Sequence, residues 1–170
     1  MCGIYGFIGF KDDKLLSQMG ECLAHRGPDD QDFYQKDLVN FGYRRLSIID
    51  VKKSFQPLFN EDKSIILLFN GEIYNFQELR EKLPKHKFVT DGDGETIIHW
   101  YEEHGGAGLK DLNGMFAISL YDTKKQKVYL IRDHFGIKPL YYSTRVQPLS
   151  GIIFASEIKA ILKKIKAKPN

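Results

Sequence analysis

The apolar residues of this chain fall into many short segments, each bounded by turn residues. The most apolar segment, Ile65 to Phe69, is followed at once by Asn70-Gly71. Segments of this length between turn residues are typical of strands. Because the segments come in pairs joined by short connections, they favour antiparallel sheets and the α+β class over a parallel βαβ fold. We expect further strands at 4–8, 32–34, 39–43, 115–121, 127–131, 138–142 and 152–155.

The segment 14–23 predicts an amphipathic helix, since its apolar residues recur at a spacing of three to four. Cys22 lies on that apolar face, so we interpret it as a core residue. Asp12 or Asp13 is the expected cap at the start of this helix. Further helices are expected at 76–83, ended by Pro84, at 96–104, and from an N-cap at Ser156.

Length and composition predict one soluble globular domain. The chain has 170 residues and a formal net charge of +3, which is too small to indicate nucleic-acid binding. Its 2 cysteines form no CxxC pair, so neither a disulfide framework nor a cysteine zinc motif is expected. No signal-peptide pattern and no membrane-length apolar run occur, so we expect no membrane association and a cytoplasmic location. We expect the domain to span 1–162, with 163–170 as a basic tail or linker.

Cys2 is the candidate nucleophile of the chain. If Met1 is removed, Cys2 holds a thiol and a free α-amine that titrates near neutral pH. One residue would then supply both a nucleophile and the base that serves it. The alternative is an ordinary residue in an unimportant terminus, because a single cysteine is only a candidate until partners are found.

Three further positions have two interpretations each. Arg45 could be a surface charge or the bidentate partner of a substrate carboxylate. Asn70-Gly71 is ordinarily a hairpin turn, but its side-chain amide and backbone N–H could form an oxyanion hole. In the acidic turn 91–95, an aspartate could bind a substrate ammonium group or cap the following helix. That turn lacks the ligand spacing of a calcium-binding EF loop. The residues alone leave these alternatives open.

Several segments together resemble one known family. In this order and combination they are similar to the glutaminase domain of glutamine-dependent asparagine synthetases, a class II glutamine amidotransferase and N-terminal-nucleophile hydrolase. The resemblance covers nearly the whole chain, and the combination is highly specific although no single motif is. The segments are Cys2-Gly3-Ile4, His25-Arg26-Gly27-Pro28-Asp29, Arg45 to Asp50, Gln56-Pro57-Leu58, Asn70 to Asn75, Gly114 to Ala117, Arg132 to Tyr142 and Ala155 to Ala160.

The resemblance implies a four-layer αββα sandwich of two mainly antiparallel sheets with helices outside. It implies that Cys2 attacks the side-chain amide of L-glutamine and that Asn70 and Gly71 form the oxyanion hole. It implies no metal and no organic cofactor for this half-reaction. The implied substrate-binding residues are Arg45 for the α-carboxylate, Asp93 for the α-amino group with Glu72 nearby, Asn70, Gly71, and backbone groups of Leu46, Ser47, Ile48 and Ile49.

The resemblance also implies a partner for the ammonia. A synthetase domain or subunit that uses ATP and Mg²⁺ would receive it, and the full-length enzyme could be a homodimer. That domain has a Ser-Gly-Gly-type pyrophosphate loop, which this sequence lacks, so we expect glutamine hydrolysis without asparagine synthesis. The alternatives are amidotransfer to another acceptor, such as a sugar acid, and a non-catalytic relic with a binding or regulatory role. The departures from the family pattern are acidic residues at 30–32, His134 in place of a common Arg, and the short match around Asp93.

Overall fold

The computed structural model describes residues 1–46 and 56–166, which belong to two compact units. The described residues of unit 1 are 1–46 and 139–166, and those of unit 2 are 56–138. Unit 1 contains β1 (Gly3–Ile8), α1 (Leu15–Cys22), β2 (Asp30–Lys36), β3 (Val39–Arg45), β8 (Tyr141–Ser143), β9 (Ile152–Ala155) and α4 (Ile158–Ile161). Unit 2 contains β4 (Leu58–Phe59), β5 (Ile65–Ile73), α2 (Phe76–Glu81), α3 (Asp93–Gly108), a short 3₁₀ turn (Leu109–Asp111), β6 (Gly114–Asp122) and β7 (Lys127–Arg132).

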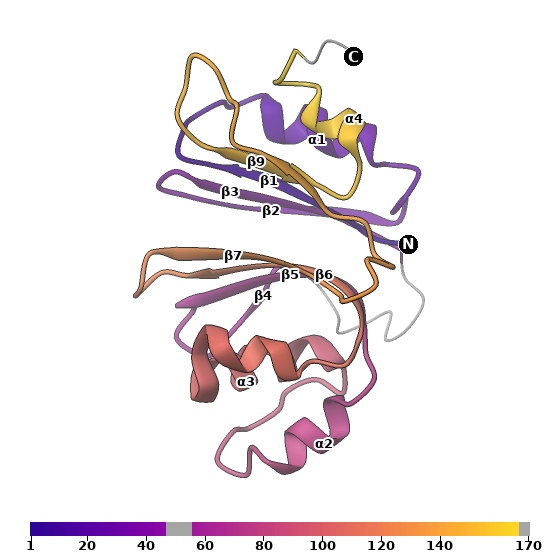
Figure 1. Cartoon of the computed structure of the whole chain (residues 1–170), viewed down its shortest axis with the longest axis vertical. Helices are drawn as coiled ribbons and strands as arrows, with labels where there is room; N and C mark the ends of the chain where they lie inside the picture. The colour runs from indigo at the N-terminus through magenta and orange to yellow at the C-terminus, as the bar shows by residue number, and fades with distance from the viewer. Residues whose placement is uncertain (47–55, 167–170) are drawn as a thin grey trace. The chain divides into compact units, whose positions relative to one another are not determined.

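Unit 1 is a five-stranded antiparallel sheet in the order β2-β3-β1-β9-β8. Helices α1 and α4 lie side by side on one face of this sheet (Figure 1). Tyr5 and Phe7 of β1 and Ile153 and Ala155 of β9 point to the helices and join their apolar core. Cys22 packs against the same core, which confirms the interpretation made from its helical face.

The other face of the unit 1 sheet carries the alternate residues, because successive side chains of a strand point to opposite faces. In the β1–β3 pair, Ile4 lies directly opposite Tyr43. Phe41 of β3 packs edge-on against Phe154 of β9, with ring centroids 5.6 Å apart. Cys2, Ile4, Tyr43 and Arg45 therefore share the face that is turned away from α1 and α4.

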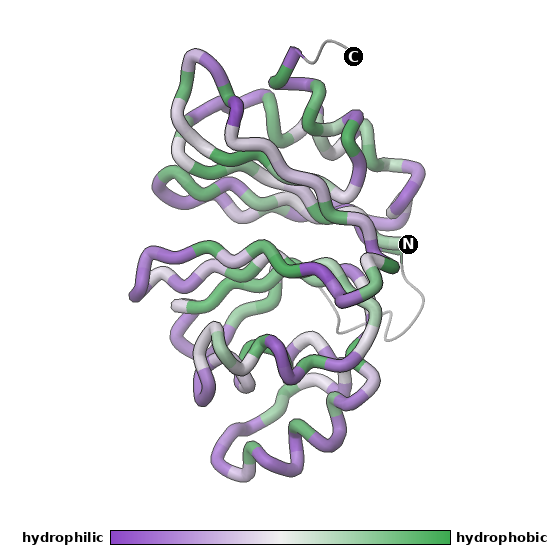
Figure 2. Tube along the Cα trace, viewed as in Figure 1, coloured by the Kyte–Doolittle hydropathy of each residue, from purple (hydrophilic) through white to green (hydrophobic). Residues whose placement is uncertain are grey.

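Unit 2 is a four-stranded antiparallel sheet in the order β4-β5-β6-β7, with α3 packed against β5 and α2 against α3 (Figure 1). The alternate residues Ile65, Leu67 and Phe69 of β5 belong to the core on the helical side. Ile66, Leu68 and Asn70 are buried as well and point to the opposite face. Figure 2 shows hydrophobic and hydrophilic residues alternating along the helices, as expected of helices with one apolar side.

Ser156 is not the N-cap of the last helix, so that prediction is wrong. Glu157 precedes α4, and no side chain caps it. The Ser156 hydroxyl instead accepts a hydrogen bond from the Ile4 N–H at 3.0 Å, and the Ser156 N–H donates to the Ile4 carbonyl at 2.8 Å. A sequence pattern cannot anticipate this contact, because the two residues are 152 positions apart.

Other predicted elements differ in their limits. Helix α3 begins at Asp93 instead of 96 and runs to Gly108, although Gly105, directly after the predicted end at 104, interrupts it with φ 61°. Strand β8 covers Tyr141 and Tyr142 of the expected 138–142 segment and ends at Ser143. Helical backbone bonds continue past α4 to Ile165, and Lys164 pairs with Asp12 at 2.7 Å. Within 1–46 and 56–166, no helix combines the length and the apolar character that a membrane crossing needs.

The loop after β7 is built around the buried carboxylate of Asp133. It accepts backbone N–H bonds from Phe116 at 3.1 Å, Phe135 at 3.1 Å, Ile137 at 2.9 Å and Lys138 at 3.0 Å. Burial alone would raise the pKa of Asp133, but these four donors outweigh it and hold the pKa below its usual value. The carboxylate therefore fixes the connection that follows β7.

We expect Asp133→Asn to destabilise unit 2 by about 3 kcal/mol at pH 7, since an amide cannot accept four N–H bonds and buried donors lose their partner. Because the folded pKa is lowered, the contribution of Asp133 is present above its ordinary value of 3.8 and is lost at lower pH. Urea unfolding at pH 7 and at pH 3 measures this. Asp13→Asn, at an exposed aspartate, is the matched control. Equal stability of the two variants at pH 7 would contradict the assignment.

Candidate active site

The thiol of Cys2 is held by the end of strand β3. Tyr43 donates its hydroxyl hydrogen to Sγ at 2.9 Å, and the Leu46 N–H donates to Sγ at 3.4 Å. Sγ also lies 3.7 Å from the Leu46 carbonyl oxygen. Leu46 thus contacts Cys2 through its backbone. Sequence reasoning missed Tyr43, which the β1–β3 register brings to the thiol.

Burial and the neighbouring Cys2 both raise the pKa of the Tyr43 phenol, and the charge of Arg45 opposes them. The phenol therefore keeps its proton at neutral pH and stays a hydrogen-bond donor to Sγ. Arg45 is the last residue of β3 and is only 6% exposed, so it is not a surface charge. By strand alternation, Arg45 and Tyr43 point to the same face of the sheet.

A second group of contacts fixes the backbone of Cys2. Arg26 donates from Nε to the Cys2 carbonyl at 3.0 Å and from Nη1 to Glu157 Oε1 at 3.1 Å. His25 Nε2 lies 2.8 Å from the same Glu157 oxygen, and Lys159 Nζ lies 3.2 Å from Oε2. The His25-Arg26 pair therefore positions the start of the chain, a role that its sequence neighbourhood did not indicate.

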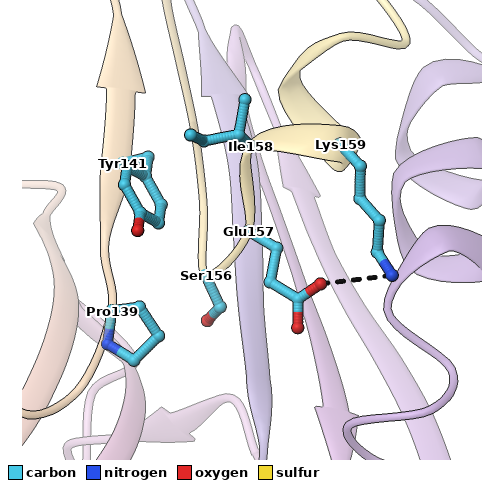
Figure 3. A pocket seen from close by; sticks show the side chains of 6 residues that line it. All are labelled: Pro139, Tyr141, Ser156, Glu157, Ile158 and Lys159. Atoms are coloured by element: carbon cyan, nitrogen blue, oxygen red, sulfur yellow. Dashed lines mark ion pairs between the residues drawn. The ribbon is translucent and has the colours of Figure 1, made fainter.

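Glu157 also lines a shallow depression beside β8, β9 and α4 (Figure 3). Its lining residues are Pro139, Tyr141, Ser156, Glu157, Ile158 and Lys159, and none of them is a predicted site residue. Figure 3 shows the carboxylate of Glu157 paired with Lys159. We therefore regard Glu157 as the anchor of Arg26 and not as a substrate ligand.

In unit 2, Asn70 and Gly71 do not form a hairpin turn. Strand β5 continues through them to Ile73 and pairs with β6, with Asn70 opposite Ala117 and Gly71 opposite Phe116. The turn interpretation is wrong because Asn-Gly favours a turn only where the strand ladder ends, and this ladder continues. Gly71 has φ 155°, and a Cβ there would lie 2.0 Å from the Met115 carbonyl oxygen. Only glycine fits this close approach of the two strands.

The side chain of Asn70 is 3% exposed, and its Nδ2 has no hydrogen-bond partner within the described residues. A buried amide donor without a partner costs free energy and is rare in folded proteins. The backbone beside it is held firmly, because Gln56 donates to the Phe69 carbonyl at 2.8 Å and accepts from the Phe69 N–H at 2.6 Å. The donor of Asn70 is therefore positioned and available.

Asp93 and Glu72 lie in the same part of unit 2. Asp93 accepts a hydrogen bond from the Ile73 N–H at 2.7 Å, which links the start of α3 to β5. Burial raises the pKa of Asp93, backbone donors oppose that shift, and the charge of Glu72 raises the pKa further. Asp93 is in the first helical turn, directly after the N-cap Gly92, and the backbone N–H groups of Asp93 and Gly94 are among the donors to its carboxylate.

The described structure thus groups the predicted residues by unit. Cys2, Arg45 and Leu46 lie together on the face of the unit 1 sheet away from its helices. Asn70, Gly71, Glu72 and Asp93 lie along the end of β5 and the start of α3 in unit 2. The predicted residues Ser47, Ile48 and Ile49 lie outside the described residues.

The Glu157 contacts predict a pH dependence. Burial alone would raise its pKa, but hydrogen bonds from His25, Arg26 and Lys159 lower it from 4.5 to about 2. Its contribution to stability is therefore complete above about pH 4.5 and is lost as the pH falls to about 2. We expect Glu157→Gln to be less stable than the parent at pH 7 and nearly equal to it at pH 2, measured by urea unfolding. Glu21→Gln, at an exposed position, is the control, and a difference independent of pH would count against this assignment.

Comparison with known proteins identifies the family of the chain. The whole chain, residues 1–170, matches a family described as a glutamine amidotransferase domain. It is 44% identical over 168 residues to asparagine synthetase (glutamine-hydrolyzing) 2 of Bacillus subtilis, an alignment that covers 95% of this chain and 22% of that protein. It is 40% identical over 166 residues to the nodule asparagine synthetase (glutamine-hydrolyzing) of Pisum sativum, covering 95% of this chain and 28% of the relative. The chain thus spans about a quarter of these relatives.

A solved structure shares the fold. The glutamine phosphoribosylpyrophosphate amidotransferase of B. subtilis, determined with ADP and GMP, superposes with a TM-score of 0.76 at 19% sequence identity. The match covers 96% of this chain and 43% of that protein. It confirms the predicted fold class, α+β with two antiparallel sheets, of the N-terminal-nucleophile hydrolases. With a family match over its full length, the chain belongs to the class II glutamine amidotransferase domains.

Proposed function

We propose that this domain hydrolyses the side-chain amide of L-glutamine through a γ-glutamyl thioester on Cys2, releasing glutamate and ammonia. The main supporting observation is that the Cys2 thiol accepts hydrogen bonds from the Tyr43 hydroxyl and the Leu46 N–H, which fix its position. The thiol lies one residue from the chain start, where removal of Met1 would leave a free amine beside it. With Met1 attached, the nitrogen of Cys2 is an amide and cannot act as a base.

The proposed reaction has two halves. The thiolate of Cys2 attacks the amide carbon of glutamine, and the carbonyl electrons move to the oxygen, which accepts hydrogen bonds from Asn70 Nδ2 and the Gly71 N–H. The α-amine of Cys2, which has taken the proton of the thiol, transfers it to the departing nitrogen as the C–N bond breaks, so that ammonia leaves and the thioester remains. The same amine then takes a proton from the water that attacks the thioester; the C–S bond breaks, glutamate leaves, and the amine returns the proton to the sulfur.

Substrate selection in this proposal uses both ends of the amino-acid head group. Arg45 binds the α-carboxylate, for which its planar guanidinium is suited. Asp93 binds the α-ammonium group with Glu72 nearby, and backbone groups of Leu46, Ser47, Ile48 and Ile49 line the site. A buried arginine and a half-buried carboxylate favour a free α-amino acid, since a peptide-linked glutamine lacks both charges.

The ammonia is proposed to serve ATP-dependent asparagine synthesis by a synthetase domain or subunit. The support is the kind of relative that this chain matches, in which it spans only 22% to 28% of the length. ATP and Mg²⁺ would belong to that synthetase part. No metal or organic cofactor is needed for the amide hydrolysis itself.

We expect the Met1-free domain to release glutamate from glutamine and Cys2→Ala to release none above background. A coupled glutamate assay measures this, with the N-terminal mass of each sample checked. Cys22→Ser is the matched control, because Cys22 packs against the unit 1 core and should not take part in the reaction. An active Cys2→Ala variant would refute the proposed nucleophile.

We expect Asn70→Ala to lower kcat by about 10²–10³ with a smaller change in KM, because the amide contributes to the transition state more than to the bound substrate. Since its Nδ2 makes no hydrogen bond within the described residues, the folded state should change little. Steady-state kinetics and a thermal melt are measured together. Unchanged kcat with an unchanged melt would exclude Asn70 from the oxyanion hole.

A further inference from the structure

Three side chains of unit 2, none of which is named for glutamine hydrolysis, bring potential metal ligands together. They are His86 in the connection between α2 and α3, and His99 and Glu102 on α3. Their ligand atoms all lie within 4.8 Å of one another. His86 Nδ1 is 3.0 Å from His99 Nδ1 and 3.6 Å from Glu102 Oε2, and His99 Nδ1 is 2.7 Å from that same oxygen.

Local structure explains why these three atoms meet. His99 and Glu102 are three residues apart on a helix, so they project from the same side. The connection reaches them because its backbone turns at His86, whose N–H donates to the Leu83 carbonyl at 3.1 Å. Phe88 of the same connection packs edge-on against the His99 ring, with centroids 5.0 Å apart. The backbone turn at His86 and the packing of Phe88 therefore fix the positions of the two imidazoles.

Two of the three side chains also have a hydrogen-bond partner for the atom that points away from the cluster, and the first is His86, whose Nε2 lies 2.9 Å from Glu103 Oε1. His99 Nε2 is buried without a hydrogen-bond partner within the described residues, and the Glu95 Oε1 oxygen lies 3.7 Å from it. Asn60 donates from Nδ2 to Glu102 Oε1 at 2.8 Å. Metal-binding imidazoles commonly have a carboxylate at the ring nitrogen that does not bind the metal. This arrangement directs the Nδ1 atoms and Glu102 Oε2 toward one point.

Electron pairs then face one another in the cluster. If His86 holds its proton on Nε2, beside Glu103, and His99 also holds its proton on Nε2, both Nδ1 atoms present lone pairs. Together with Glu102 Oε2 they form three acceptors at separations of 2.7–3.6 Å. A single proton on one Nδ1 serves that atom and its nearest acceptor, whereas a metal ion between the three satisfies all of them.

We propose that His86, His99 and Glu102 bind a divalent transition-metal ion of the zinc class. Two imidazoles and one carboxylate suit Zn²⁺, and ligand bonds of about 2.0–2.2 Å place tetrahedral ligands about 3.3 Å apart. The observed separations lie on both sides of that value. The fourth position is left for water. The ion ties the connection 84–92 to α3 and takes no part in the chemistry at Cys2.

This site was not expected from the sequence, where the search for a zinc motif rested on paired cysteines. Its ligands are separated by 13 and 3 positions. The longer separation has no characteristic motif, because it depends on how the connection folds back. The signal that could have been used is the three-residue spacing of His99 and Glu102 on a predicted helix.

The test is a metal titration of the chelator-treated domain. Zn²⁺ is followed by calorimetry and Co²⁺ by its visible absorption. We expect one ion per chain and a cobalt spectrum without a sulfur charge-transfer band, since no thiol is a ligand. His86→Ala and Glu102→Gln should weaken binding at least about 100-fold. Glu103→Gln, which changes only the outer partner of His86, should weaken it by about 10–100-fold.

Two controls separate this site from other metal-binding groups. His104→Ala removes an imidazole of α3 whose ring contacts Trp100 and lies outside the cluster, so it should bind like the parent. A Cys2→Ser, Cys22→Ser double variant should also bind like the parent, which makes the result independent of the proposed hydrolysis. A thermal melt checks that each variant is folded.

Three results would overturn the proposal. They are no stoichiometric binding by the parent, binding that is retained in both His86→Ala and Glu102→Gln, and binding that disappears in the double cysteine variant. If His86→Ala is unfolded, the surface variant Glu103→Gln decides, because its side chain is about half exposed and its removal leaves the core intact. Equal affinity of Glu103→Gln and the parent would then count against the site.

Discussion

The structure of unit 1 depends on the pairing of the first strand of the chain between two later ones. Strand β1 is the middle strand of its sheet, hydrogen-bonded to β3 on one side and to β9 on the other. A chain end ordinarily frays, but an end that continues a central strand cannot move without breaking two ladders. Ser156 extends one of these ladders by binding both backbone groups of Ile4. The position of Cys2 follows from these pairings before any contact of its own side chain is considered.

In both units, polar side chains form hydrogen bonds with backbone groups that would otherwise need another strand as a partner. Gln56 pairs with both backbone groups of Phe69 as a neighbouring strand would, and Asp133 accepts three N–H groups of its own loop and one of β6. Arg26 does the same for the Cys2 carbonyl. Each of these residues belongs to a segment by which the chain resembles its family. Such segments therefore contain residues that shape the site without touching a substrate, and buried polar groups of this kind are costly to replace.

Sequence reasoning succeeded where the signal is local. Short apolar segments bounded by turn residues predicted most strands, and the short connections between them predicted antiparallel pairs such as β2–β3 and β6–β7, because both signals depend on neighbours only a few positions away. It failed where a distant partner decides. Asn70-Gly71 does not form a turn because β5 continues to pair with β6 at these residues. Ser156 does not cap the helix because its hydroxyl binds the backbone of Ile4. In the site, the residue types were predictable from the resemblance, whereas Tyr43 beside the thiol required the strand register.

Helix α3 contributes to both proposed sites of unit 2, the substrate-binding Asp93 and the metal-binding cluster of His86, His99 and Glu102. Its first residue, Asp93, binds the backbone of β5, and its second turn offers His99 to the cluster. Glu95 lies between them and accepts the N–H groups of Val89 at 2.8 Å and Thr90 at 2.7 Å. The connection is thus already attached to the helix by hydrogen bonds, and a metal ion would strengthen an existing attachment. Binding of the ion should therefore leave the fold unchanged and make the start of the helix, where Asp93 lies, more rigid.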